Sequence, residues 1–185
     1  MTHAVYFTIM VEHYTKAFVL AREPRGELDA ALTLYTKDLG KVVAKIKSVR
    51  RITSKLSGHL VPGSLANVRI VERNGNGHQV VDALSTHLEI NLESLRFLDF
   101  VNKLTPAGVP DLQLWHELES TLMKKIPSKD TYQKVISLMG YDAKNAACDN
   151  CGSRQIAYFV PRDIMFLCAR CSTDSRLKQD EAFPI

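Results

Sequence analysis

The chain has 185 residues, of which 45% are apolar, 24% charged and 8% aromatic, and these values exclude a disordered, collagen-like or fibrous chain. The formal net charge of +4 is uneven, because residues 1–85 contain 12 basic and 7 acidic side chains while residues 86–185 contain 12 and 13. A basic first half is typical of a module that binds a polyanion, although the same charge could serve solubility alone.

The amino-terminal segment lacks the features of a secretory signal. Its first 16 residues have no basic region ahead of the apolar stretch and include Glu12, so we expect a cytoplasmic protein. The most apolar stretches, such as Ala17–Ala21 and Ile164–Cys168, are far shorter than the roughly 20 residues that span a bilayer. We therefore expect no membrane span.

The first half of the chain has the pattern of short strands separated by turn residues. The five predicted strands are Lys16–Ala21, Ala30–Thr36, Gly40–Lys47, Leu65–Glu72 and Gln79–Leu88. The last two are predicted to form a hairpin through the loop Arg73–His78, because its Asn and Gly residues tolerate positive φ. Five short strands in about 75 residues suit a small barrel of the OB type.

Basic side chains gather in the third predicted strand and in the segment after it, residues 41–59, which we call the basic tract. It contains no acidic residue and six basic ones: Lys41, Lys45, Lys47, Arg50, Arg51 and Lys55. In the strand, apart from Val43, lysines alternate with apolar residues and so share one face. Such a cluster binds phosphate without reading bases, which predicts a nucleic-acid surface, with a solvated basic face as the alternative. Tyr35 is a candidate for base stacking and equally for the core.

After Glu89 the apolar residues recur every three or four positions, which predicts helices. The first helix is expected to end at the segment Thr105–Pro110. The second is predicted to begin at the N-cap Asp111, and the third to run from the N-cap Ser128 to Gly140 as its C′ residue.

All four cysteines lie in two Cys-x-x-Cys pairs, Cys148–Cys151 and Cys168–Cys171, with 16 residues between the pairs. This spacing is typical of a zinc ribbon, in which two metal-binding turns flank a hairpin. The strand-like runs Ile156–Val160 and Ile164–Leu167 would form that hairpin. Four thiolates would complete the coordination shell of a structural zinc ion and leave no position for a substrate. An iron–sulfur cluster, two disulfides and a redox-active pair are the alternatives.

The motifs of common enzyme classes are incomplete in this sequence. His116-Glu117 begins a metalloprotease pattern, but Ser120 stands at the position of the second histidine. His87 and Glu89 match part of a zinc-deaminase motif, but Ala147 replaces its proline. Since a P-loop is also lacking, we predict that the protein is not an enzyme.

In their order along the chain, these parts resemble the family of the bacterial recombination mediator RecO. The resemblance rests on Val19–Glu27, on Leu34–Lys41, on the basic tract with Ser54-Lys55-Leu56, and on the carboxy-terminal C-x2-C-G…C-x2-C pattern. It covers about residues 14–172. It implies an α+β protein with two parts. Residues 1–88 would form an OB-fold barrel, and residues 89–185 a helical domain with a four-cysteine, zinc-ribbon-like insertion at residues 148–171.

The same resemblance implies a DNA-binding mediator of DNA repair and homologous recombination in the RecFOR pathway. It implies binding to single- and double-stranded DNA, annealing of complementary strands, and help in loading RecA onto DNA coated by SSB. The implied partners are RecR and the carboxy-terminal tail of SSB, and the implied location is the bacterial cytoplasm, in association with the nucleoid.

The resemblance also assigns roles to residues. The six basic residues of the basic tract become DNA contacts, and Cys148, Cys151, Cys168 and Cys171 become ligands of a structural zinc ion. This chain has Ile46-Lys47-Ser48 where the family usually has Lys-Gly after the third strand. A zinc-ribbon protein that binds RNA or a protein subunit in the ribosome or the transcription machinery is the alternative function.

Overall fold

The chain folds into two compact units in a computed structural model that describes residues 10–73, 77–86, 88, 90–124, 126–178 and 180–185. One unit comprises Met1–His87 with Gly108–Pro110, and the other comprises Leu88–Ala107 with Asp111–Ile185. The middle of the predicted loop Arg73–His78, residues 74–76, lies outside the described residues, as do residues 87 and 89 near the expected boundary.

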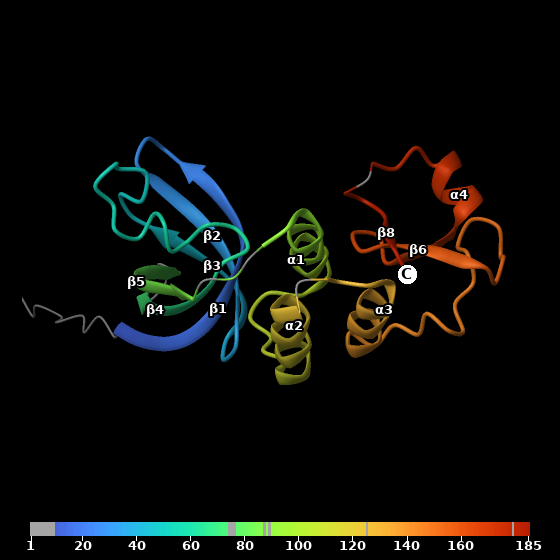
Figure 1. Ribbon diagram of the computed structural model, residues 1–185, viewed down its shortest axis with the longest axis horizontal. Coiled ribbons are helices and arrows are strands. Elements are labelled where there is room, and N and C mark those ends of the chain that lie inside the picture. Colours follow the sequence, from blue (N-terminus) through green and yellow to red (C-terminus); the bar gives the residue numbers. More distant parts are fainter. Residues whose placement is uncertain (1–9, 74–76, 87, 89, 125, 179) are drawn as a thin grey trace, which may run out of the picture. The chain divides into compact units, whose positions relative to one another are not determined.

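The first unit is a closed barrel of five strands (Figure 1). The strands are β1 (Met10–Arg25), β2 (Asp29–Thr36), β3 (Gly40–Ile46), β4 (Leu65–Arg73) and β5 (His78–Thr86). Their order around the barrel is β1-β2-β3-β5-β4, and β4 pairs with β1 to close it. All neighbours are antiparallel except β3 and β5, which are parallel. The five predicted strands are therefore confirmed, although β3 ends at Ile46 instead of Lys47 and β5 ends at Thr86 instead of Leu88.

β1 is longer than predicted, because it pairs with two strands in succession. Met10–Phe18 pairs with β4, and Ala17–Arg25 pairs with β2. The register shifts between Val19 and Ala21, and such an irregularity bends a strand and lets it turn a barrel corner.

The barrel interior is filled by the alternating apolar residues of these strands. In β3, Val42, Ala44 and Ile46 are buried while Lys45 is exposed, as the sequence pattern predicts. The barrel core consists of Ala17, Val19, Ala30, Leu32, Leu34, Val42, Ala44, Ile46, Val49, Leu60, Ala66, Val68, Ile70, Val80 and Ala83.

The segment Gly108–Pro110 packs against the barrel at the start of β3. The Gly108 amide donates to the Lys41 carbonyl at 2.8 Å. Gly40 has φ +66°, and a Cβ at this position would lie 2.2 Å from the Val109 carbonyl oxygen. Only glycine fits there, because the site combines a left-handed conformation with close backbone approach.

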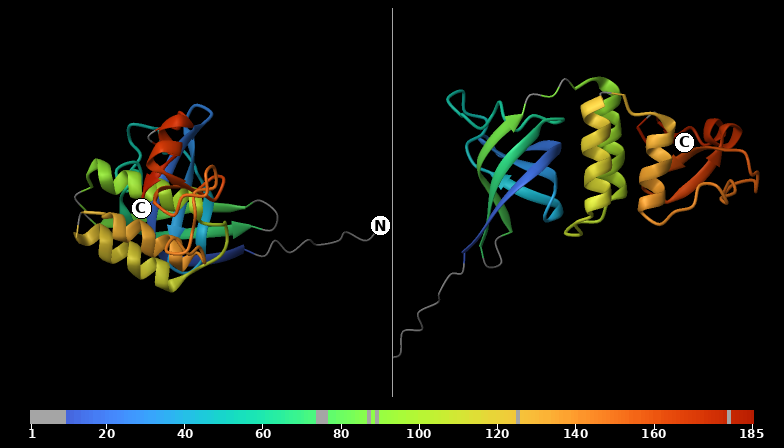
Figure 2. Two further views of the ribbon diagram at one scale, coloured as in Figure 1. Left: turned by 90° about the vertical axis from the view of Figure 1, so that its right-hand side faces the viewer. Right: turned by 60° about the horizontal axis from the view of Figure 1, so that its bottom comes forward.

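The second unit begins with three helices, α1 (Leu92–Leu104), α2 (Leu112–Lys124) and α3 (Lys129–Leu138), which lie side by side (Figure 2). The predicted caps are confirmed. Asp111 accepts a hydrogen bond from the Leu114 amide at 3.0 Å, and Ser128 forms a capping box. Gly140, at φ +88°, ends α3 as its C′ residue. Among the described residues, no helix has the length and apolar character that a membrane crossing requires.

A small sheet of order β7-β6-β8 completes the second unit. It contains the predicted hairpin of β6 (Ile156–Val160) and β7 (Met165–Cys168), followed by α4 (Ala169–Asp174) and β8 (Phe183–Pro184). The Phe100 ring lies 5.0 Å from the Tyr132 and Phe183 rings and 6.3 Å from the Phe159 ring. This aromatic cluster joins the helices to the sheet.

Candidate nucleic-acid surface and metal centre

The basic tract begins in β3 and continues into a segment of turns, residues 47–64. Five of its six basic residues are exposed: Lys45, Lys47, Arg50, Arg51 and Lys55. Lys41 is half-buried, and its burial lowers the pKa of its ammonium group. The structure therefore presents five of the predicted residues to solvent and leaves Lys41 less accessible.

The 47–64 segment is anchored to the barrel although it has no helix or strand. Two of its apolar side chains are fully buried in the barrel core: Val49 and Leu60. The Arg50 guanidinium donates to the Gly26 carbonyl at 2.8 Å, and the His59 ring lies 2.9 Å from the Ser85 hydroxyl. These contacts hold the cationic side chains on a defined backbone.

Lys45 forms an ion pair within the barrel. Its ammonium lies 3.1 Å from the Asp29 carboxylate, which also accepts a hydrogen bond from the Ser48 amide at 2.9 Å. The Ser48 amide and then Lys45 lower the pKa of Asp29. For the other four exposed members, no ion pair with a carboxylate occurs in the described part of the chain. Most of the positive charge of the tract is therefore available to a ligand.

Tyr35 and Ser48 both bear on the predicted nucleic-acid surface. Tyr35 is 1% exposed, so it belongs to the core and cannot stack on a base. Ser48 stands after the third strand, where the resemblance leads us to expect Lys-Gly, and it has φ +54°. This left-handed conformation favours glycine, so the loop keeps a glycine-like backbone without the glycine.

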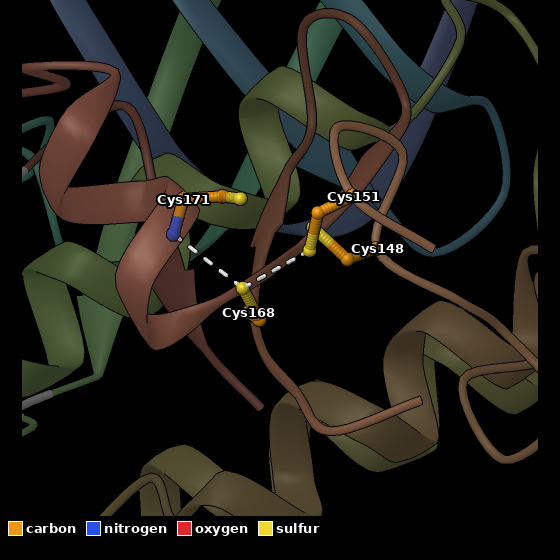
Figure 3. Close-up of side chains that lie close together, drawn as sticks. All are labelled: Cys148, Cys151, Cys168 and Cys171. Atoms are coloured by element: carbon orange, nitrogen blue, oxygen red, sulfur yellow. Dashed lines mark hydrogen bonds between the residues drawn. The ribbon is translucent and has the colours of Figure 1, made fainter. Parts of the chain in front are cut away.

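The four cysteines converge from the end of the hairpin (Figure 3). Cys148 and Cys151 precede β6, Cys168 ends β7, and Cys171 lies in α4. All four sulfur atoms lie within 4.8 Å of one another, and the Cys151 and Cys168 sulfurs are 3.7 Å apart. Tetrahedral sulfur ligands about 2.3 Å from zinc would be about 3.8 Å apart. The cluster therefore has a size that suits one metal ion.

The backbone around the cluster supports this geometry. Gly152, at φ +72°, donates its amide to the Cys148 carbonyl at 2.8 Å and closes the first turn. Asp149 and Phe166 tie that turn to β7 through two hydrogen bonds, of 2.9 and 2.7 Å. All four cysteines are free thiols, which disagrees with the disulfide alternative.

The thiols of the cluster differ in their tendency to ionise. Hydrogen bonding from backbone amides, first that of Cys168, lowers the pKa of Cys148 to about 6. Hydrogen bonding with the Cys151 and Cys168 side chains raises the pKa of Cys171 to about 12. Several thiolates crowded together repel one another, so full deprotonation of the cluster requires a cation.

The incomplete protease motif has a structural role in α2. The Glu117 carboxylate pairs with the Lys134 ammonium, which lies in α3. Among the described residues, the four cysteines are the group of three or more potential ligands that could hold a metal ion. His116 and Glu117 are not part of it.

Comparison with known proteins shows that the chain is similar to DNA repair proteins. Residues 10–87 match the family model of the recombination protein O amino-terminal domain. The DNA repair protein RecO of Dehalococcoides mccartyi is 27% identical in an alignment of length 176 that covers 85% of this chain and 69% of that protein. For RecO of Thermodesulfovibrio yellowstonii the identity is 26% in an alignment of length 179, with coverages of 87% and 71%. For RecO of Acetivibrio thermocellus the identity is 29% in an alignment of length 180, with coverages of 85% and 69%.

Proposed function

We propose that the chain is a member of the RecO family, to which it is similar over most of its length, and that it is a DNA-binding mediator of homologous recombination. Family membership supports a role in DNA repair and recombination. The proposal extends this role to direct binding of single- and double-stranded DNA through the basic tract.

The observation that carries the proposal is the anchored, cationic surface of the barrel. Lys47, Arg50, Arg51 and Lys55 are exposed on a segment that buried apolar side chains hold in place. Fixed cations that neutralise phosphates bind strands without regard to sequence. The strand order β1-β2-β3-β5-β4 supports assignment of the barrel to the OB type, which binds oligonucleotides.

In this mechanism the protein brings strands together and breaks no covalent bond. By neutralising phosphates, the basic tract lowers the repulsion between complementary strands and allows them to anneal. The same DNA contacts would place the protein on SSB-coated DNA, where RecR and the SSB tail are its partners and RecA is loaded. Such a role fits a non-enzymatic protein of the bacterial cytoplasm, associated with the nucleoid.

The cysteine cluster is proposed to bind structural zinc. Cys148, Cys151, Cys168 and Cys171 would fill all four positions of the ion. Bound zinc would hold the turns of the cluster together and would leave no position for substrate.

Annealing of SSB-coated complementary oligonucleotides, with and without RecR, tests the proposal. We expect the protein to accelerate annealing in a salt-sensitive way, with RecR altering the rate on SSB-coated strands. A protein that binds neither single- nor double-stranded DNA at low salt would contradict the proposal. Preferential binding to a structured RNA would instead support the zinc-ribbon alternative.

A further inference from the structure

A small cleft lies on the barrel beside the basic tract. Its volume is about 190 Å³, and it is lined by Arg22, Pro24, Ala30, Arg50 and Pro62. β1 and β2 provide the first three of these residues, and the 47–64 segment provides the last two. None of the described residues that line the cleft is acidic. Two arginines therefore share one cleft without a carboxylate in its walls.

Hydrogen bonds hold both arginines between the barrel strands and the 47–64 segment. Arg22 reaches from β1 to the 47–64 segment, where it donates to the Ser57 carbonyl at 3.1 Å and to the Ser57 hydroxyl at 3.4 Å. Arg50 reaches from that segment to the β1–β2 turn, where it donates to the Gly26 carbonyl at 2.8 Å. Both guanidinium groups are thus positioned before any ligand binds, which lowers the entropic cost of binding.

Most of the donors of both side chains remain available. A guanidinium has five N–H donors, of which Arg22 uses two in these contacts and Arg50 uses one. The remaining donors need acceptors, and the positive charges repel each other unless an anion lies near them. A phosphate group satisfies both needs, because its oxygens accept several hydrogen bonds in the planar arrangement that arginine offers.

The walls of the cleft also limit what can bind. Pro24, Ala30 and Pro62 have no polar side-chain group with which to read the edge of a base. The two arginines are therefore the polar side chains of the cleft, and their positive charges favour an anionic phosphate over an uncharged base.

We propose that Arg22 and Arg50 form a phosphate subsite that holds one backbone phosphodiester of a bound DNA strand. This inference rests on the proposed DNA-binding function and adds Arg22, a residue of β1, to the DNA-binding surface. Because the subsite is fixed on the barrel, it would set the path of the strand from β1 along the basic tract.

The test measures the salt dependence of binding of a fluorescent single-stranded oligonucleotide to the full chain. The variants are Arg22→Ala, Arg50→Ala and the double variant. Arg25→Ala is the matched control, because Arg25 lies on the same strand but outside the cleft, exposed and 3.8 Å from Glu23. We expect each cleft variant to weaken binding roughly tenfold at low salt. The double variant should lower the salt slope by about one, since both side chains hold one phosphate. Arg25→Ala should bind like the wild type.

A second pair of variants keeps the contacts of both arginines. Pro62→Glu places a carboxylate at the cleft, whereas Val61→Glu places one at the neighbouring exposed position outside it. We expect a larger loss of DNA affinity for Pro62→Glu than for Val61→Glu. Equal losses would contradict the subsite even if Arg22→Ala loosened the segment through Ser57.

A titration with inorganic phosphate alone distinguishes a phosphodiester from a free anion. We expect weak, millimolar binding of phosphate to the wild type. Micromolar phosphate binding, together with oligonucleotide binding that does not depend on Arg22, would overturn the inference. If the wild type fails to bind the oligonucleotide, the proposed function fails. If the wild type binds but the double variant keeps its affinity and slope, the subsite fails and Arg50 is not a DNA contact, while DNA binding through the rest of the basic tract stands.

Discussion

At the scale of single residues, Lys45 shows how one acidic neighbour limits a basic side chain. Asp29 pairs with Lys45 and also accepts the Ser48 amide, so it holds the start of the 47–64 segment against β2. The same carboxylate adds a negative charge beside the basic tract. Asp29 therefore stabilises the local fold but reduces the net positive charge of the surface.

Asp29→Asn separates these two effects, because the amide can still accept from Ser48 but lacks the charge. We expect DNA to bind roughly two- to fivefold more tightly at low salt, the range of an exposed ion pair. The lowered pKa of Asp29 means that its stabilising effect is present above the usual value of 3.8 and is lost as pH falls through the lowered pKa. Thermal midpoints from pH 7 to pH 2 should thus fall more steeply for the wild type than for Asp29→Asn. Identical pH profiles and identical affinities would contradict this role.

Ser48 provides a second test at the residue scale. A side chain in the left-handed region costs about 1 kcal/mol, so we expect Ser48→Gly to raise the free energy of unfolding by about that amount. Ser54→Gly, in the same segment but outside the residues with positive φ, should lower it by about 0.5 kcal/mol. Urea denaturation measures both. Destabilisation by Ser48→Gly as large as that by Ser54→Gly would show that the Ser48 backbone is not strained.

At the scale of elements, the start of β3 depends on a segment distant in sequence. Gly40 lies against the Val109 carbonyl, and the Lys41 carbonyl accepts a hydrogen bond from the Gly108 amide. Residues 108–110 therefore complete the barrel edge from which the basic tract begins.

Gly40→Ala is expected to destabilise the protein by about 3 kcal/mol, since its Cβ would collide with backbone that a side-chain rotation cannot move. Gly26→Ala is the matched control, because Gly26 has the same φ of +66° but has no atom near its Cβ position. It should cost only about 1 kcal/mol. Chemical denaturation of both variants measures the difference, and equal losses would show that the Val109 contact is unimportant.

The helices and strands that could be predicted from the sequence are those whose patterns depend on residues close together in the chain. Alternation in β3, the caps Asp111 and Ser128, and Gly140 at the end of α3 all depend on residues close in the chain. β8 has two residues and exists only through its pairing with β6, so its own sequence has no strand pattern. The predicted strand from Ile164 begins at Met165 instead, because Ile164 has φ +54° in the turn.

In the candidate sites, too, features that depend on nearby residues could be predicted, and features that depend on distant contacts could not. The spacing of the cysteines was sufficient to predict that they cluster, since each pair lies in one turn and a hairpin joins the pairs. The contact of Lys45 with Asp29 and the cleft of Arg22 with Arg50 could not be predicted, because both depend on strand register and on the path of a loop.

At the scale of the whole molecule, metal binding should govern stability. Three of the four cysteines are buried and form part of a small core with Val160, Leu167 and Ala182. Without a metal ion, that core would contain crowded thiols that no ion holds together.

We expect the purified protein to contain one zinc ion per chain. A strong chelator, or Cys148→Ser, should lower the thermal midpoint by at least about 10 °C, which corresponds to roughly 3–5 kcal/mol. Added zinc should restore the midpoint of the chelated wild type but not that of Cys148→Ser. An unchanged melt together with metal-free protein would contradict a structural zinc site.

The central claim is that the basic tract binds DNA through phosphate contacts. Its most direct test is the salt dependence of DNA affinity for the triple variant Lys47→Ala, Arg50→Ala, Arg51→Ala. A control variant with Arg154, Arg162 and Arg170 changed to alanine removes the same charge elsewhere in the chain. We predict that the tract variant loses affinity equally on different sequences and that its salt slope falls by about two to three, because Arg22 is left to hold the phosphate that it shares with Arg50. The control should keep both its affinity and its slope. Normal affinity and an unchanged slope in the tract variant would contradict the claim.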